Sequence, residues 1–303
     1  AIRRQRQMCI RDRLFTCDNG IAALQEIVLA KEKGMTVVVL DHHEPGFRGE
    51  GEERRDILPA ADAIIDPKQR ACPYPFKQMC AGGLSYYFAH HLLQIFEITD
   101  EWMERQLLTF AGIATVCDIV DLLGENRALV QMGLEEIRKT ENIGLRVLIE
   151  EAGLSDKVIS EYHIGFIIGP CINATGRLES GRLAVELFCT QDEKEAREKA
   201  RHLVMLNAER KQLTEEAAER ADIALQEGGA LQHGSVTVGQ DTGVHGPEQG
   251  IGQILVGSGA VSHGAEHEFC VLIGVDSPGG LEGRGCVAIR IALFIGVALS
   301  LIH

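Results

Sequence analysis

The spacing of apolar and polar residues divides the chain into alternating predicted strands and helices. Apolar runs at residues 36–40 and 63–65 show no polar alternation, which is typical of buried strands in a parallel sheet. Between residues 21 and 33, apolar residues recur at three- and four-residue steps, which predicts a helix that stops at Gly34. A strand ending at Cys17, this helix and the strand at 36–40 predict a βαβ unit with a right-handed crossover.

The pattern beyond residue 80 is mainly helical. Helices are expected at 81–96, at 101–116, from Glu125 to about Ile137 and at 144–151, and the second of these is apolar on all sides and therefore buried. The apolar run 165–170 is expected to be a strand that enters a loop at 171–178, and the Gly- and charge-rich residues 46–55 are expected to form a mobile loop. Residues 191–227 predict a long, charged helix with one modest apolar stripe, which suits a connector between domains.

Ionisable side chains follow two of the predicted strands. Asp18 comes after the first strand, and Asp41, His42 and His43 come directly after the strand at 36–40. In open α/β sheets, ligands bind at the carboxyl ends of the strands, where these residues converge. Aspartate and neutral histidine are common ligands of divalent metals, so the sequence predicts a metal site at this edge, although a plain polar turn is the alternative.

Two further positions are candidates for the same site. Asp118 ends the buried helix, where a metal would supply the partner that a buried carboxylate needs, but the residue taken alone slightly favours a carboxylate that simply reaches solvent. Asn173, Gly176 and Arg177 lie close together and would suit a phosphate cradle, because Arg offers a forked donor and Gly allows close backbone approach. An ordinary turn with a surface arginine is the alternative.

Composition limits the class of protein without identifying it. The chain has 303 residues, 45% of them hydrophobic, and a formal net charge of −14, which argues against a generally basic nucleic-acid binder but not against a nuclease with bound metal. Its nine cysteines show no Cys-x-x-Cys pair, which favours free thiols in a reducing cytoplasm. The apolar run 291–302 is shorter than the roughly 20 residues that span a bilayer, and no membrane association is expected.

The two ends of the chain differ from its middle. Residues 1–13 are basic, lack an apolar period and look like a translated cloning adapter, so they are treated as a foreign leader. Residues 228–303 hold 17 of the 33 glycines and show no clear period, which favours a disordered or frameshifted tail over a glycine-rich β domain. The expected organisation is therefore a leader (1–13), an α/β domain (14–190), a connector helix (191–227) and an uncertain tail (228–303).

Five stretches in order resemble the DHH phosphoesterase superfamily, and within it the RecJ-type exonucleases specific for single-stranded DNA. The stretches are TCDNG, VVVLDHHEP, ADAIIDP, GIATVCDIVDLLGENRALVQMGL and IGPCINATGRL. The resemblance implies a parallel-sheet domain with helices on both faces and a two-metal phosphodiesterase site using Mn²⁺ or Mg²⁺. It implies that Asp18, His42 and Asp118 bind metal, that His43 contacts the scissile phosphate or leaving group, that Asp41 orients the histidines, and that Asn173 and Arg177 hold substrate phosphate.

The implied function is 5′-to-3′ digestion of single-stranded DNA in cytoplasmic DNA repair and recombination, with a single-strand-binding protein and a helicase as partners. The family's Asp-x-Asp-x-Asp-Gly stretch is absent, since no Asp-x-Asp occurs in the chain, and its C-terminal Gly-Gly-His domain is not recognisable. We therefore expect that the natural protein begins further upstream and that this chain is inactive. A DHH phosphatase acting on pyrophosphate, oligonucleotides or dinucleotides, and a non-catalytic DHH scaffold, are the alternatives.

Overall fold

The N-terminal half of the fold is built on a four-stranded sheet. The computed structural model describes residues 13–178, 181–227 and 270–272, and these ranges are meant wherever the structure is described. The strands are β1 (Arg13–Cys17), β2 (Thr36–Leu40), β5 (Ala63–Ile65) and β6 (Cys270–Leu272), in the order β5-β2-β1-β6. β2 is parallel to both β1 and β5, whereas β6 is antiparallel to β1. The predicted βαβ unit is confirmed.

Helices cover both faces of this sheet, as expected. Val37 and Val39 of β2 pack against Ile27 and Ala30 of α1 (Leu24–Glu32) on one face. The alternate residue Leu40 and its β1 neighbour Cys17 point to the other face, because side chains along a strand alternate. There they pack with Met79 and with Ala81 and Leu84 of α2 (Ala81–Ile95).

A small hairpin replaces the loop expected at residues 46–55. β3 (Gly46–Arg48) and β4 (Arg55–Ile57) pair antiparallel around a 3₁₀ turn, η2 (Gly51–Glu53). Gly49 adopts a φ of +81°, which glycine tolerates and other residues rarely do. The prediction of an unstructured loop was wrong because glycine marks tight turns as well as flexible segments.

A helical layer follows the sheet and contains the largest core of the described chain. It comprises α3 (Glu101–Cys117), α4 (Gly124–Ile137), α5 (Ile143–Glu151), α6 (Glu161–His163) and α8 (Arg182–Cys189). α3 is buried along most of its length from Met103 to Thr115, as its apolar sequence predicts.

Residues 164–178 form helix where a strand and a loop were expected. A π-helical turn, η3 (Ile164–Ile168), runs into α7 (Gly169–Leu178). A short apolar run cannot be assigned to strand or helix by periodicity alone, which explains the error. Gly169 permits close packing on α3, because a Cβ at this position would lie 2.5 Å from Cys117 Sγ.

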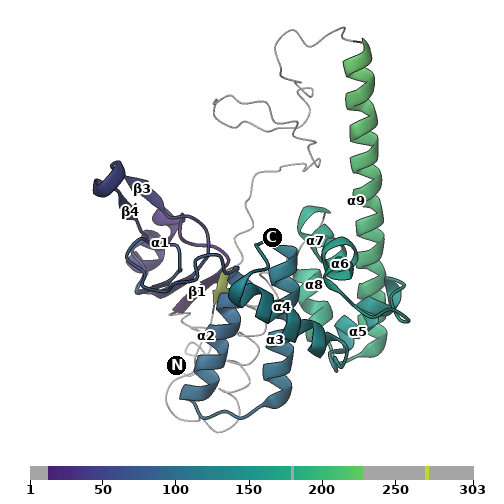
Figure 1. Cartoon of the computed structure of the whole chain (residues 1–303), viewed down its shortest axis with the longest axis horizontal. Coiled ribbons are helices and arrows are strands. Elements are labelled where there is room, and N and C mark those ends of the chain that lie inside the picture. Colours follow the sequence, from purple (N-terminus) through teal and green to yellow (C-terminus); the bar gives the residue numbers. More distant parts are fainter. Residues whose placement is uncertain (1–12, 179–180, 228–269, 273–303) are drawn as a thin grey trace, which may run out of the picture.

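The long helix α9 (Glu193–Glu227) corresponds to the predicted connector. Its first half is anchored by the buried residues Ala196, Ala200, Leu203 and Leu206, and Leu213 beyond them is 41% exposed. The second half extends away from the other labelled helices (Figure 1). Within the described residues, no helix is both long and apolar enough to cross a membrane.

The predicted domain boundaries at the two ends stay predictions, and only Arg13 and residues 270–272 of these segments are described. Arg13, assigned to the leader, is the first residue of β1 and pairs with Thr36. Residues 270–272 form β6 within the segment for which no strand was predicted. The other residues of the predicted leader and tail, including 291–302, lie outside the described ranges.

Candidate metal centre

The carboxyl ends of β1, β2 and β5 form one edge that carries acidic and histidine side chains. The strand ladder continues one residue past the strands, because Asp18 N–H donates to Leu40 O at 3.0 Å and Asp41 N–H donates to Ile65 O at 3.0 Å. These two hydrogen bonds fix the backbone at which the side chains emerge. The edge therefore gathers Asp18 and Asp41 at adjacent strand ends, as the sequence predicted.

His42 lies between two carboxylates from different elements. Its Nε2 is 3.0 Å from Asp18 Oδ1 and its Nδ1 is 3.6 Å from Asp118 Oδ2. Asp118 is the residue that caps the C-terminal end of α3, so the buried helix delivers it to the sheet edge. Asp18 and Asp118 are therefore both neighbours of His42, whereas the residues whose ligand atoms all lie within 4.8 Å of one another are Asp18, His42 and His43, so Asp118 as a third metal ligand stays a prediction.

The backbone at Asp18 adopts an uncommon conformation. Its φ is +62°, in the left-handed region of backbone conformations that residues other than glycine seldom adopt. Gly20 follows with φ +114°, and a Cβ there would lie 2.6 Å from Thr16 Oγ1. Such strained conformations persist where the surrounding structure fixes them, and they cluster at functional sites.

Two oxygens at this site lack hydrogen-bond donors. Asp18 Oδ1 and Asp118 Oδ2 are buried, and neither accepts a hydrogen bond within the described part of the chain. Burial raises the pKa of Asp118, and the negative charge of Asp18 also raises it, while His42 lowers it. The C-terminal end of a helix also repels a negative charge. A bound cation would coordinate these oxygens, to which His42 lies close without making a hydrogen bond, so the residues fit a divalent metal.

Asp41 holds the two histidines in place. Its Oδ1 accepts hydrogen bonds from the backbone N–H groups of His42 and His43 and contacts His43 Nδ1 at 2.7 Å, while Oδ2 accepts from Ile21 N–H at 2.9 Å. Burial raises the pKa of this carboxyl, but these hydrogen bonds outweigh burial and leave the pKa below its usual value. A carboxylate bonded to the far nitrogen of a histidine is a common support for metal-site imidazoles.

His43 is the exposed member of the group. Its side chain is 58% exposed, and the hydrogen bond to Asp41 raises its pKa above the usual value. One ligand atom from each of Asp18, His42 and His43 can be chosen so that all three lie within 4.8 Å of one another. The ring therefore faces the candidate centre and remains accessible to a substrate.

Asp66 is a member of this edge to which sequence reasoning gave no role. It follows β5, is 2% exposed, and its Oδ2 accepts no hydrogen bond from the described residues. Burial, and to a lesser degree the charge of Asp41, raise its pKa to about 6, although the Lys68 N–H hydrogen bond and the charges of Lys68 and His42 act to lower it. Its position directly after an apolar strand is the same signal that identified Asp18 and Asp41.

The predicted phosphate-binding residues lie on α7 rather than in a loop. Asn173 is half-buried, and its Oδ1 accepts no hydrogen bond within the described ranges. Arg177 is four residues further along the same helix, which places the two on one helix face. α7 begins against Cys117, next to Asp118, so the helix starts beside the centre.

The N-terminal part of the chain matches a known family. The family model described as "DHH family, N-terminal domain" matches residues 2–115. The single-stranded-DNA-specific exonuclease RecJ of Bacillus subtilis is 39% identical over 208 residues, which are 69% of this chain and 24% of that protein. The protein of the same name from Escherichia coli is 33% identical over 210 residues, 66% of this chain and 35% of that protein.

Solved structures agree with these matches. A crystal structure of RecJ from Thermus thermophilus with Mn²⁺ superposes with a TM-score of 0.58 at 29% identity, covering 69% of this chain and 30% of that one. A manganese-bound exonuclease RecJ gives a TM-score of 0.60 at 29% identity, covering 71% and 52%. The chain spans between 24% and 42% of the curated relatives it matches. The sequence matches, the shared fold and the acidic and histidine edge together show that this chain contains a domain of the DHH family, and the relatives it matches are exonucleases named RecJ.

Proposed function

We propose that the chain is the DHH part of a metal-dependent phosphodiesterase that degrades single-stranded DNA as an exonuclease of the RecJ type. The observation that carries this proposal is the position of His42 between two buried carboxylate oxygens that accept no hydrogen bond within the described residues, Asp18 Oδ1 at 3.0 Å and Asp118 Oδ2 at 3.6 Å. The names of the relatives supply the substrate class, and the manganese-bound structures support Mn²⁺ or Mg²⁺ as the cofactor.

In this proposal Asp18, His42 and Asp118 hold the cation. When bound, a divalent metal would polarise a phosphoryl oxygen and lower the pKa of a water molecule. Asp41 keeps His43 in one orientation, and the exposed His43 ring contacts the scissile phosphate or the leaving oxygen. Asn173 and Arg177 on α7 would hold a neighbouring phosphate.

Several finer expectations remain predictions. Digestion from 5′ to 3′, a role in repair and recombination, a cytoplasmic location, and a single-strand-binding protein and a helicase as partners all follow from the resemblance. We also expect little turnover by this chain, because it contains no Asp-x-Asp stretch to complete a metal pair. Low turnover alone would fit either an incomplete metal site or a substrate of another class. Measuring substrate binding as well separates these two explanations.

The test combines binding and hydrolysis. Binding of fluorescent single-stranded DNA, duplex DNA, a dinucleotide and pyrophosphate would be compared with Mn²⁺ present, and release of nucleotides from 5′-labelled single strands would be measured beside Bacillus subtilis RecJ. We expect preferential binding of single strands and any release to require Mn²⁺ and His42. Preference for pyrophosphate or a dinucleotide, or no binding of single strands, would refute the proposal.

A further inference from the structure

The turn that follows β5 holds Lys68 in a defined position at the edge of the centre. The backbone N–H of Lys68 donates to Asp66 Oδ1 at 2.7 Å. The side-chain amide of Gln69 donates to Asp66 O at 3.0 Å and to Ile64 O at 3.4 Å. The backbone from which Lys68 projects is therefore tied to the end of β5, beside the end of β2.

The ammonium group of Lys68 lies beside the residues that carry the proposed chemistry. Its Nζ is 3.9 Å from Oε1 of Glu44, which directly follows His43. Its charge also lowers the pKa of both Asp66 and Asp118, which belong to different elements. Lys68 is therefore a fixed cation near a cluster of carboxylates from β2, β5 and α3.

The contact with Glu44 leaves the ammonium group able to bind another anion. A distance of 3.9 Å is too long for a hydrogen bond, and the Glu44 side chain is 69% exposed, so this pair adds little stability. The side chain of Lys68 is 27% exposed, so its donors can be reached from solvent. An ammonium group with free donors beside an acidic site can bind a phosphate oxygen.

We propose that Lys68 binds a backbone phosphate of single-stranded DNA beside the candidate metal centre, which rests on the proposed function. The site would otherwise present Asp18, Asp66 and Asp118 to a polyanion, and the chain as a whole carries a net charge of −14. Lys68 offsets this local repulsion at one nucleotide position. It is a substrate-binding residue and not a metal ligand.

The test measures DNA binding without divalent cation, so that it does not depend on catalysis. Fluorescence anisotropy of a labelled oligothymidylate would be recorded over a series of NaCl concentrations for the full chain and for Lys68→Ala. Each phosphate contact on a single strand contributes about 0.7 to the slope of log K against log salt. We expect Lys68→Ala to weaken binding and to reduce the slope by about that amount, and Lys68→Arg to retain it.

Two controls separate a direct contact from other effects. Lys33, an exposed residue just after α1 and near the start of β2, lies at the opposite end of the sheet, so Lys33→Ala should leave the slope unchanged. Mn²⁺ affinity should be equal or higher in Lys68→Ala, because a nearby positive charge has been removed. An unchanged DNA slope in Lys68→Ala overturns the inference alone, and no binding of single-stranded DNA by the unaltered chain, either without Mn²⁺ or after Mn²⁺ is added, overturns the proposed function with it.

Discussion

At the scale of single residues, the edge of the sheet concentrates negative charge that the described protein atoms only partly neutralise. Asp41 is well supplied with donors, whereas Asp18, Asp66 and Asp118 each keep one buried oxygen without a hydrogen bond. A buried oxygen without a donor costs about 1–3 kcal/mol, so each of these positions opposes folding unless something binds there. Asp41 therefore supports the site through its hydrogen bonds, whereas Asp18, Asp66 and Asp118 have oxygens available to a ligand.

Asp66 provides a prediction about stability and pH. The pKa of the Asp66 carboxyl is raised to about 6 in the folded chain, so folding disfavours its ionised form. The resulting loss of stability is absent at pH values below the pKa of the unfolded chain and complete at pH values above the pKa of the folded chain. Asp66→Asn should therefore stabilise the metal-free chain at pH 7.5 by about 1–3 kcal/mol, with no gain at pH 3. Urea unfolding at both pH values measures this, and an equal effect at the two values would contradict it.

At the scale of elements, sequence reasoning located most of the elements that build the site. β1, β2, β5, α2 and α3 were predicted to within a few residues, because apolar runs and helical periods are strong there. Asp18 and His42 were expected at one edge because parallel strands share it, whereas Asp118, at the end of α3, was assigned to the same site only through the family resemblance. The strand predicted at 165–170 was wrong, because a short apolar run fits a buried helix equally well.

Other features depend on contacts that a sequence does not display. The pairing of β6 with β1 joins residues more than 250 positions apart, and nothing in the local pattern of residues 270–272 indicates it. Asp66 differs from these cases, because its position directly after the apolar strand β5 is the same sequence signal that predicted Asp18 and Asp41 at this edge. Met132 of α4 is 42% exposed although it is apolar, so an apolar residue does not by itself mark the buried face of a helix.

Packing of α3 against α4 gives a prediction at this scale. The helices approach at two glycines, and a Cβ on Gly133 would lie 2.9 Å from Gly112 Cα, which is backbone and cannot move aside alone. Gly133→Ala should therefore destabilise the chain by about 1–3 kcal/mol in denaturant unfolding. Gly165→Ala is the matched control, because its Cβ would meet only Val116 Cγ1 at 3.5 Å. Equal stability of the two variants would show that the helices are not in close contact.

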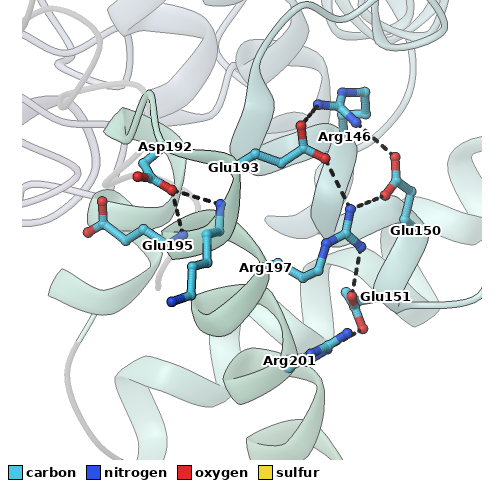
Figure 2. Close-up of polar contacts among 9 residues, drawn as sticks. Arg146, Glu150, Glu151, Asp192, Glu193, Glu195, Arg197 and Arg201 are labelled. Carbon is cyan, nitrogen blue, oxygen red and sulfur yellow. Dashed lines mark hydrogen bonds and ion pairs between the residues drawn. The ribbon is translucent and has the colours of Figure 1, made fainter.

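At the scale of the whole molecule, an ion-pair network fastens α9 to the helical layer. Figure 2 shows Arg197 of α9 reaching Glu150 and Glu151 of α5, at 3.0 and 2.9 Å, and Glu193 at 3.2 Å. Arg201 reaches Glu151 as well, at 3.1 Å. The network orients the first half of α9, and thus the direction in which its second half leaves the domain.

The network predicts a pH-dependent effect of Arg197→Met. Burial of Glu151 opposes its ionisation, but Arg197 and Arg201 hold its pKa below the usual value. The ion pairs of Glu151 therefore stabilise the fold at pH values above the pKa of the unfolded chain, and this stabilisation disappears in acid. Arg197→Met should lower the urea midpoint at pH 7, and its difference from the unaltered chain should close near pH 3. Arg220→Met, on the exposed half of the same helix, should have little effect. A difference that persists in acid would mean that packing and not charge is responsible.

The central claim is that Asp18, His42 and Asp118 share one cation, and calorimetric titration with Mn²⁺ tests it most directly. The unaltered chain should bind Mn²⁺, and His42→Ala and Asp118→Asn should each lose at least about tenfold in affinity, while Asp156→Asn, an exposed aspartate on another loop, should not. Thermal unfolding without metal would confirm that the variants are folded. Mn²⁺ binding that is unchanged in both His42→Ala and Asp118→Asn would contradict the account.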